Sequence, residues 1–308
     1  MGITTTYFSF DYSPGARALG VLATYDHLDP YTPVTGFYQY VVAQSQWGSL
    51  RFRGFRATSL AYAGTSPSSG LWLIGTRGEV WKVIGDEVVN QDQLPDSGLD
   101  GRGLGQPNEI RMIDGQPYVC GYAGQVYTLR GDQWVHMDYG LGEPTGRVDS
   151  IDLESIDGTG PDDIYTVGSG GLVAHWDGRA WRRLPALTNV YLARVRCFER
   201  NHIAAVGDKG VFLQSDGQSW RIERIPAAED TPLSDVASFQ GRLYVAALRR
   251  LFVRDGDAWS EVRHGLPKDK TSFRRLVVGA GRLWSMGHAR LNSFDGKKWE
   301  AHPDANNG

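Results

Sequence analysis

The chain has 308 residues, a length that suits either two ordinary domains or one large all-β domain. Hydrophobic residues account for 41% of the sequence and charged residues for 22%, which excludes an intrinsically disordered chain. The 32 basic and 35 acidic residues leave a formal charge of −3, too balanced to indicate a nucleic-acid-binding protein.

No targeting segment is evident. The first twenty residues contain neither the basic start nor the apolar core of a secretory signal. No apolar run approaches the roughly 18 residues that a membrane-spanning helix needs. Cys120 and Cys197 each stand in an apolar stretch, which fits two buried thiols in a reducing compartment better than a disulfide. We therefore expect a cytoplasmic protein without a membrane partner.

Residues 1–54 form the least regular part of the sequence. They contain four runs that favour strands, because these runs are rich in β-branched and aromatic residues. The runs are Thr5–Tyr12, Ala18–Tyr25, Phe37–Val42 and Leu50–Phe55.

A repeat extends over the whole chain. Its clearest form is Asp-Gly-x-x-Trp, which occurs in full four times between residues 177 and 299. Complete and degenerate copies supply seven anchor positions: Trp47, Val88, Trp134, Trp181, Trp220, Trp259 and Trp299. These anchors are spaced 39 to 47 residues apart, as expected for a repeated structural unit.

Each anchor follows the same succession of strands and turns. In the fourth unit the run Ile164–Gly168 leads through a glycine pair to Gly171–Trp176, and then to the Asp-Gly turn. A further run lies upstream of each such pair, as in Leu233–Phe239 or Phe273–Val278. Glycine pairs and Asp-Gly favour tight hairpins. Each unit is therefore predicted to hold four antiparallel strands, A to D.

Four-stranded units of this length are typical of propeller blades, which must stack into a closed ring because one blade cannot bury both of its faces. We predict an all-β fold, a seven-bladed β-propeller in a single domain over residues 1–308. Blade 1 is expected in residues 1–54 and blades 2–7 in residues 55–303. The alternative is six blades with an N-terminal extension, in which the strand Tyr7–Phe10 completes another sheet.

The segments Asp163–Gly168 and His175–Trp181 resemble the repeats of bacterial propeller proteins that read Asp-Val-Trp-Ala-Val-Gly followed by His-Trp-Asp-Gly-x-x-Trp. The resemblance extends over residues 56–303 and implies the fold alone. A more distant resemblance is to Asp-box propellers such as sialidases. Here Ser215–Trp220 lacks two spacer residues of the Asp-box, and Arg224-Ile225-Pro226 lies in a middle blade rather than near the N-terminus.

We find no sequence motif that predicts catalysis or metal binding. The seven histidines form neither His-x-His nor His-Glu-x-x-His, so we expect no metal and no cofactor. Gly101–Gly105 is followed by Gln106-Pro107 where a phosphate loop would require a helix. The acidic residues between Asp149 and Asp163 are spread too widely for one calcium loop and indicate a solvated acidic segment.

The D–A and B–C loops of a propeller share one face, called here the top face, and we predict that a partner binds there. The candidates in B–C turns are Arg77, Tyr122, Lys209, Arg249, Arg250, His288 and Arg290. The candidates at the inner A strands are Arg111, Arg147, Arg194 and Arg274. The basic residues comprise 26 arginines and 6 lysines, which suits bidentate contacts with carboxylates.

Two further expectations concern this face. The strand A arginines have an alternative role, which is to pair with Asp114, Asp149 or Asp235 of neighbouring blades. The long D–A loops are expected to expose apolar side chains that resemble a binding hot spot. These side chains are Leu94, Leu99, Leu104, Tyr139 and Leu141.

The sequence thus predicts a non-enzymatic, protein-binding propeller, in its most concrete form an immunity protein that binds and neutralises a toxin effector with an acidic surface. One alternative is a glycan hydrolase or lyase with a site at the channel mouth. Its candidate residues are Tyr122, His288, Asp235 and the strand A arginines. The other alternative is a structural scaffold with a flat top of mixed charge.

Overall fold

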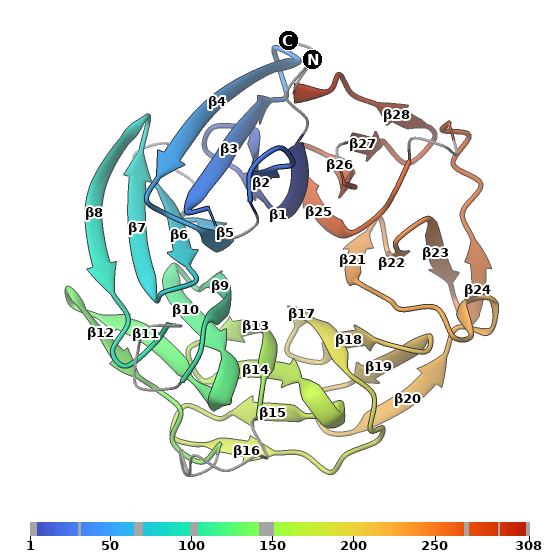
Figure 1. Cartoon of the computed structure of the whole chain (residues 1–308). Helices are drawn as coiled ribbons and strands as arrows, with labels where there is room; N and C mark the ends of the chain where they lie inside the picture. Colours follow the sequence, from blue (N-terminus) through green and yellow to red (C-terminus); the bar gives the residue numbers. More distant parts are fainter. Residues whose placement is uncertain are drawn as a thin grey trace.

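The computed structural model describes residues 5–29, 32–64, 70–98, 104–141, 151–267, 271–288 and 290–305. In these ranges the strands form seven four-stranded antiparallel sheets, arranged as blades around a central axis (Figure 1). The predicted seven-bladed propeller is confirmed. β1 pairs with β2 inside blade 1 rather than with another blade, so the alternative of six blades plus an extension is wrong.

The strands follow in chain order, four to a blade, from the innermost strand A to the outermost strand D. Blades 1 to 3 contain β1 (Thr5–Ser13), β2 (Ala18–Tyr25), β3 (Val34–Val41), β4 (Gln46–Arg53), β5 (Ala57–Tyr62), β6 (Leu71–Gly75), β7 (Glu79–Ile84), β8 (Glu87–Gln93), β9 (Pro107–Ile113), β10 (Gln116–Gly121), β11 (Val126–Arg130) and β12 (Gln133–His136). Blades 4 and 5 contain β13 (Leu153–Gly160), β14 (Asp163–Gly168), β15 (Val173–Trp176), β16 (Trp181–Arg183), β17 (Leu192–Glu199), β18 (His202–Gly207), β19 (Val211–Ser215) and β20 (Trp220–Arg224). Blades 6 and 7 contain β21 (Asp235–Phe239), β22 (Arg242–Ala247), β23 (Arg250–Asp255), β24 (Ala258–Glu261), β25 (Arg275–Gly279), β26 (Arg282–Met286), β27 (Leu291–Phe294) and β28 (Trp299–Ala301).

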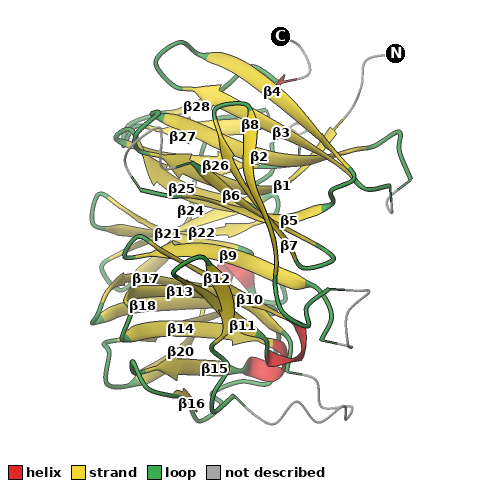
Figure 2. Ribbon diagram, turned by 90° about the vertical axis from the view of Figure 1, so that its left-hand side faces the viewer, coloured by secondary structure: helices red, strands yellow, loops and turns green. Residues whose placement is uncertain are grey.

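Short 3-10 helices lie in the connections: η2 (Tyr122–Gly124), η3 (Ser169–Gly171) and η4 (Pro226–Ala228). Seen edge-on, the ring carries its B–C and D–A connections on one side, which is the right-hand side of Figure 2 and faces the viewer in Figure 1. This side is the top face. The four runs predicted for blade 1 coincide with β1 to β4 to within a few residues.

The core consists of apolar layers between neighbouring blades. Strand B shows this best: β6 and β14 are buried along their whole length, because side chains alternate between two faces and a neighbouring blade covers each face. Trp72 of blade 2 therefore packs with Ile110 and Tyr127 of blade 3. Strand D lies at the outer wall, and most residues of β8 are exposed.

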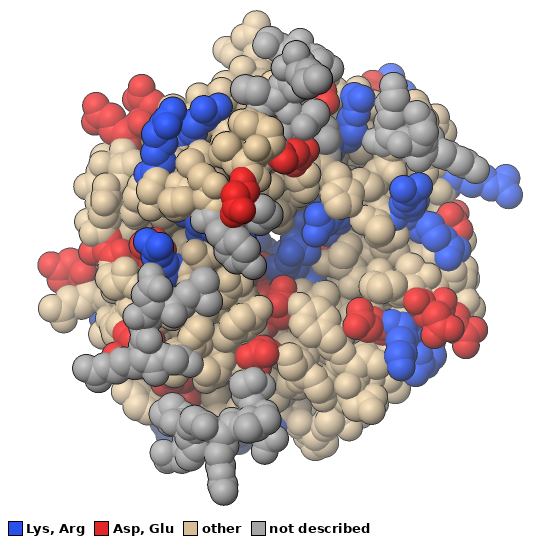
Figure 3. All heavy atoms as spheres, in the orientation of Figure 1, with Lys and Arg blue, Asp and Glu red and all other residues tan. Residues whose placement is uncertain are grey.

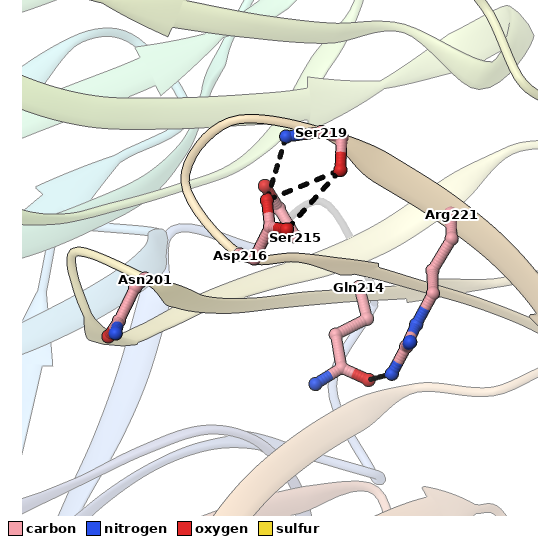
Figure 4. A pocket seen from close by; sticks show the side chains of 6 residues that line it. All are labelled: Asn201, Gln214, Ser215, Asp216, Ser219 and Arg221. Carbon is pink, nitrogen blue, oxygen red and sulfur yellow. Dashed lines mark hydrogen bonds between the residues drawn. The ribbon is translucent and has the colours of Figure 1, made fainter.

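The Asp-Gly-x-x-Trp motif forms the turn between strands C and D. In blade 5 the Oδ1 atom of Asp216 accepts the N–H groups of Gln218 at 3.0 Å and Ser219 at 2.8 Å (Figure 4). Gly217 adopts a φ of +85°, a conformation that disfavours other residues. Asp177 and Asp295 cap their turns in the same way.

The tryptophan that closes the motif connects its blade to the preceding one. The Trp181 indole donates to the carbonyl oxygen of Met137 at 2.7 Å, and the Trp259 indole donates to Glu223 Oε1 at 2.6 Å. Both acceptors belong to or follow strand D of the preceding blade. Trp181 and Trp259 thus join neighbouring blades, whereas the Nε1 atoms of Trp134 and Trp299 are buried without a hydrogen-bond partner.

The glycine that ends strand B in these blades has a steric reason. At Gly121 a Cβ atom would lie 2.6 Å from the carbonyl oxygen of Gln106, in the segment that leads into strand A of the same blade. Gly168 and Gly207 meet the backbone of Asp152 and Tyr191 in the same manner. Glycine therefore lets the D–A connection pass directly over the end of strand B on the top face.

Blades 1 and 7 close the ring without sharing a strand. The Trp47 indole donates to the carbonyl oxygen of Pro303 at 2.8 Å, which repeats the tryptophan contact of the other blades. The Tyr40 hydroxyl lies 3.0 Å from His302 Nδ1, and Ser293 Oγ lies 2.8 Å from His302 Nε2. Burial and the nearby Arg282 lower the pKa of His302 to about 4, so the closure uses a neutral imidazole.

Candidate partner-binding face

Polar side chains on the inner strands tie each blade to the next. In several blades a strand A carboxylate accepts a backbone N–H of the following strand A. The pairs are Asp11 with Tyr62 (3.0 Å), Glu109 with Ile156 (3.0 Å), Asp157 with Cys197 (3.1 Å) and Asp235 with Leu276 (3.0 Å). These bonds satisfy backbone donors of strand A that face the preceding blade rather than strand B. The carboxylates bring negative charge into a buried region, where it needs compensation.

Arginines on the same strands supply that compensation. Arg194 donates to Glu109, Arg196 Nη2 lies 3.4 Å from Asp235 Oδ1, and Arg111 Nε lies 3.1 Å from Asp157 Oδ1. Burial alone would raise the pKa of Glu109, but the arginines, with Arg194 first, lower it to about 2. Two predicted partner-binding residues, Arg111 and Arg194, are therefore held in ion pairs inside the ring.

One alternative role expected for the strand A arginines was pairing with Asp235, and this pairing is present. Arg194 Nε lies 3.9 Å from the Asp235 carboxylate. Asp149 and the predicted site residue Arg147 lie outside the described residues. The Nε atom of Arg194 has no hydrogen-bond partner, although the residue is only 4% exposed.

A second group of arginines lies at the top of the ring and lacks such partners. Within the described ranges, no carboxylate lies within 4.0 Å of Arg274 or Arg275. Arg275 Nη1 donates to the carbonyl oxygen of Ser234 at 3.1 Å, and Arg274 Nη1 lies 3.5 Å from His288 Nδ1. Burial lowers the pKa of both guanidinium groups, that of Arg275 to about 10 with a contribution from Arg194.

The remaining predicted residues lie in B–C turns of the top face. Arg77, Lys209, Arg249 and His288 are exposed, and Tyr122 is 39% exposed. Arg250 is half-buried: its Nη2 lies 2.7 Å from Glu261 Oε2 and its guanidinium stacks over Phe252. Arg290 is also half-buried.

Only some of these residues come together. A bridge between Leu248 and Phe273 places the B–C turn of blade 6 against the segment that enters β25. The N–H of His288 donates to Ser272 Oγ at 3.0 Å on the other side of that segment. Arg249, Arg274 and His288 are therefore neighbours, whereas Arg77, Tyr122 and Lys209 stand on other blades.

The exposed apolar side chains differ from those expected. Leu94 and Leu141 are buried between blades rather than exposed, because the D–A connections pack against neighbouring blades. Leu104 is half-buried, Tyr139 is exposed, and Leu99 lies outside the described residues. Residues that the sequence analysis missed are exposed in top-face connections: Leu187, Tyr191 and Leu248. Leu248 directly precedes two arginines in a B–C turn, and that position was the available signal.

Figure 3 shows the top face with basic and acidic atoms both present near the central opening. A small cavity of about 40 Å³ lies in this channel, and strand A residues line it, among them Glu154, Arg194 and Arg275. Tyr191 forms a hydrogen bond with Glu154, whose pKa is raised by burial. A second hollow, of about 160 Å³, lies between turns of blade 5 on the opposite face and has polar walls (Figure 4).

The residues proposed for a catalytic site are not assembled as one. Asp235 is fully buried and accepts N–H groups from Val236 and Leu276. Tyr122 lies on blade 3 and His288 on blade 7, and burial raises the pKa of Tyr122. In the part of the chain that the structure describes, no three His, Cys, Asp or Glu side chains are grouped so that they could hold a metal ion. Over the same part, no helix has the length and apolar character needed to cross a membrane.

Comparison with known proteins gives one clear sequence relative. No protein-family model matches the chain. The immune protein Tsi7 of Pseudomonas aeruginosa is 32% identical over 228 residues, which cover 74% of this chain and 74% of that protein.

Solved structures share the fold at much lower identity. YCF48 from Cyanidioschyzon merolae aligns with a TM-score of 0.66 at 12% identity and covers 99% of this chain and 95% of its own. The WD40 repeats of RRP9 align with a TM-score of 0.69 at 10% identity, over 94% of this chain and 89% of theirs. At such identities the similarity shows a propeller fold and nothing about the ligand.

Proposed function

This chain belongs to the family of the immune protein Tsi7 and is an immunity protein with a protein partner, and on that premise we propose that it neutralises a protein toxin by binding it with the top face. The family membership carries the immunity function. The top face is our inference from the structure. We also propose that binding takes place in the cytoplasm of the cell that makes the protein.

The exposed side chains of the top face support this choice. Leu248 is 46% exposed and stands next to Arg249, while Leu187 and Tyr191 are exposed in the connection between blades 4 and 5. Aromatic, apolar and arginine side chains that project together from a rigid scaffold are typical of binding hot spots. Because strands hold these connections at both ends, little conformational entropy is lost on binding.

The charge of the exposed turns supports an acidic toxin surface. Arg77, Lys209 and Arg249 are exposed on three different blades of this face. Since the whole chain carries a formal charge of −3, these positive groups are a local feature. Local positive charge accelerates association with an acidic partner and disfavours basic ones.

The function can be tested in two steps. A tagged copy of the chain is used to capture proteins from its native host, and mass spectrometry identifies them. Each candidate is then expressed alone and together with the chain in a test bacterium. A toxin partner should arrest growth when expressed alone, and co-expression should restore growth. A captured protein that remains toxic in an excess of the chain would not be the target of immunity.

The face can be tested with the same partner. The double variant Arg249→Glu with Arg250→Glu should weaken a 1:1 complex at least about tenfold, because it places two negative charges opposite an acidic surface. Arg242→Glu is the matched control, since Arg242 is exposed at the start of β22 on the opposite face. Unchanged affinity of the double variant would reject the basic part of the top face as the interface and leave the immunity function intact.

A further inference from the structure

The top face contains four basic side chains on the neighbouring blades 6 and 7, near the channel mouth. Arg249 is in the B–C turn of blade 6, Arg274 and Arg275 lead into β25, and His288 is in the B–C turn of blade 7. We call these four residues the basic cluster. The bridge between Leu248 and Phe273 holds one side of this arrangement, and the bond from His288 N–H to Ser272 Oγ holds the other.

The arginines of the basic cluster form no ion pair in the described ranges, unlike the arginines of the inner strands. Arginines elsewhere in the ring have carboxylates close by, as Arg111 has Asp157, Arg196 has Asp235 and Arg254 has Glu223. In the described ranges, no carboxylate lies within 4.0 Å of Arg249, Arg274 or Arg275. A partly buried guanidinium without a counter-charge is unfavourable, because it loses hydration and gains no ion pair.

The local potential is accordingly positive. Burial and then the charges of Arg274 and Arg249 lower the pKa of His288, while the charge of Asp26 acts in the opposite direction. Burial and then the charge of Arg194 lower the pKa of Arg275, while the charges of Asp235 and Glu109 act in the opposite direction without cancelling this effect. An anion placed among these groups would relieve the repulsion between them.

We propose that the basic cluster is a carboxylate-binding site that receives an acidic side chain of the bound toxin, with Arg275 as its innermost group. This inference rests on the proposed function. Arg275 lines the cavity in the channel, and one of its nitrogen atoms is already fixed by the carbonyl oxygen of Ser234. Its remaining donors can form the two parallel bonds that a carboxylate accepts from arginine.

The surroundings favour a single protein carboxylate over a nucleic acid. Glu154 lines the same cavity as Arg275 and introduces negative charge on the side of blade 4. A phosphate backbone extends over many charges and would meet this acidic side, whereas one Asp or Glu side chain can reach the basic cluster alone. The exposed Tyr191 and Leu248 flank the mouth and would contact the apolar surroundings of that side chain.

The test uses the toxin identified as described above and three variants of the full chain. Arg275→Gln and Arg274→Gln remove one guanidinium each, and Arg242→Gln is the control on the opposite face. We expect Arg275→Gln to raise the Kd at least about tenfold, mainly through faster dissociation, since one partner of a buried ion pair is lost. Arg242→Gln should leave the Kd unchanged. If Arg275→Gln does not fold, Arg274→Gln tests the same site, because Arg274 is a half-buried member of the basic cluster.

The toxin side is tested by converting its acidic residues singly to amides. An amide at the toxin residue that enters the basic cluster should weaken binding to the wild-type chain. The same amide should have little further effect on binding to the Arg275→Gln variant, because the partner of that carboxylate is already missing. In parallel, inorganic phosphate is titrated against the free chain while the melting temperature is followed.

The outcomes are distinct. Wild-type affinity of both Arg274→Gln and Arg275→Gln for the toxin would overturn the carboxylate site, while the proposed function would stand. Stabilisation by phosphate that Arg275→Gln abolishes, together with unchanged toxin affinity, would also overturn it and assign the site to a free anion. If the wild-type chain neither binds nor neutralises any toxin, the proposed function itself fails.

Discussion

Arginines on the inner strands and arginines at the top of the ring arise from the same repeat, but the fold gives them different surroundings. Arg194 is buried and contacts Glu109, because strand A needs carboxylates that bond to the next blade. Arg249 lies in an exposed turn with no carboxylate close by in the described residues. The arginines that the repeat places around the channel therefore belong to two different parts of the ring. The inner part stabilises the fold, and only the outer part is available to a partner.

The largest effect should follow from removing the Arg194 side chain. Arg194→Ala leaves Glu109 and Asp235 short of a partner in a buried region, so the free energy of unfolding should fall by about 3–5 kcal/mol. Urea denaturation measures this. The control Arg242→Ala, which breaks an exposed pair, should cost less than about 1 kcal/mol. A loss as small as that of the control would contradict the division between inner and outer arginines.

Acid should reveal the same inner network. The pKa of Glu109 is about 2 in the folded chain, below its ordinary value of 4.5. The ionised carboxylate therefore stabilises the fold above pH 4.5, and this contribution is lost as the pH falls from 4.5 towards 2. At about 1.4 kcal/mol for each pKa unit, the loss is on the order of 3 kcal/mol. Glu109→Gln should flatten the stability curve in that range, and an unchanged slope would show that other groups dominate.

Added salt should weaken the effect of the exposed arginines on the top face more than that of the buried arginines on the inner strands. Raising the ionic strength from about 0.05 to 0.5 M should slow association with the toxin several-fold, since the exposed turns are screened. The free energy of unfolding should change by less than about 1 kcal/mol, because the inner pairs are shielded from solvent ions. Association rates and denaturation curves measured in the same buffers provide the comparison. Association that does not respond to salt would remove the case for steering by the top face.

The smallest expected effect concerns His288. The nearby charges of Arg274 and Arg249 add to burial in lowering its pKa. Arg249→Gln should therefore raise the pKa of His288 towards its ordinary value, as an NMR titration of the imidazole would show. Arg77→Gln, on blade 2, should leave this pKa where it is. Equal values in all three proteins would mean that Arg249 does not reach the imidazole.

The repeat made the fold predictable to a large extent. The anchors from Trp134 onward marked the blades, because each tryptophan lies in strand D just after the turn that follows strand C. Strand ranges in blade 1 followed from β-branched and aromatic runs alone. The turn positions of Arg249 and His288 followed from the repeat as well.

The pairing inside the ring was not predictable in the same way. Glu109, Ser155 and Arg194 meet through single inward positions on three different strands, and Glu109 is 46 residues from Ser155 and 85 from Arg194 in the sequence. Nothing local in the sequence indicates which carboxylate faces which arginine. Leu94 and Leu141 were misjudged for a related reason, because a connection without a strand pattern can still be covered by the next blade.

The closure between blades 1 and 7 has a consequence for engineering. Every sheet is built from four consecutive strands, and Tyr7, near the start of the described chain, lies in the same apolar cluster as Ala305, near its end. A short linker between the two ends of the chain, with new termini opened in any other connection between blades, would yield a circular permutant in which all seven sheets stay intact. A set of such permutants would allow a reporter to be placed at a chosen point of the rim.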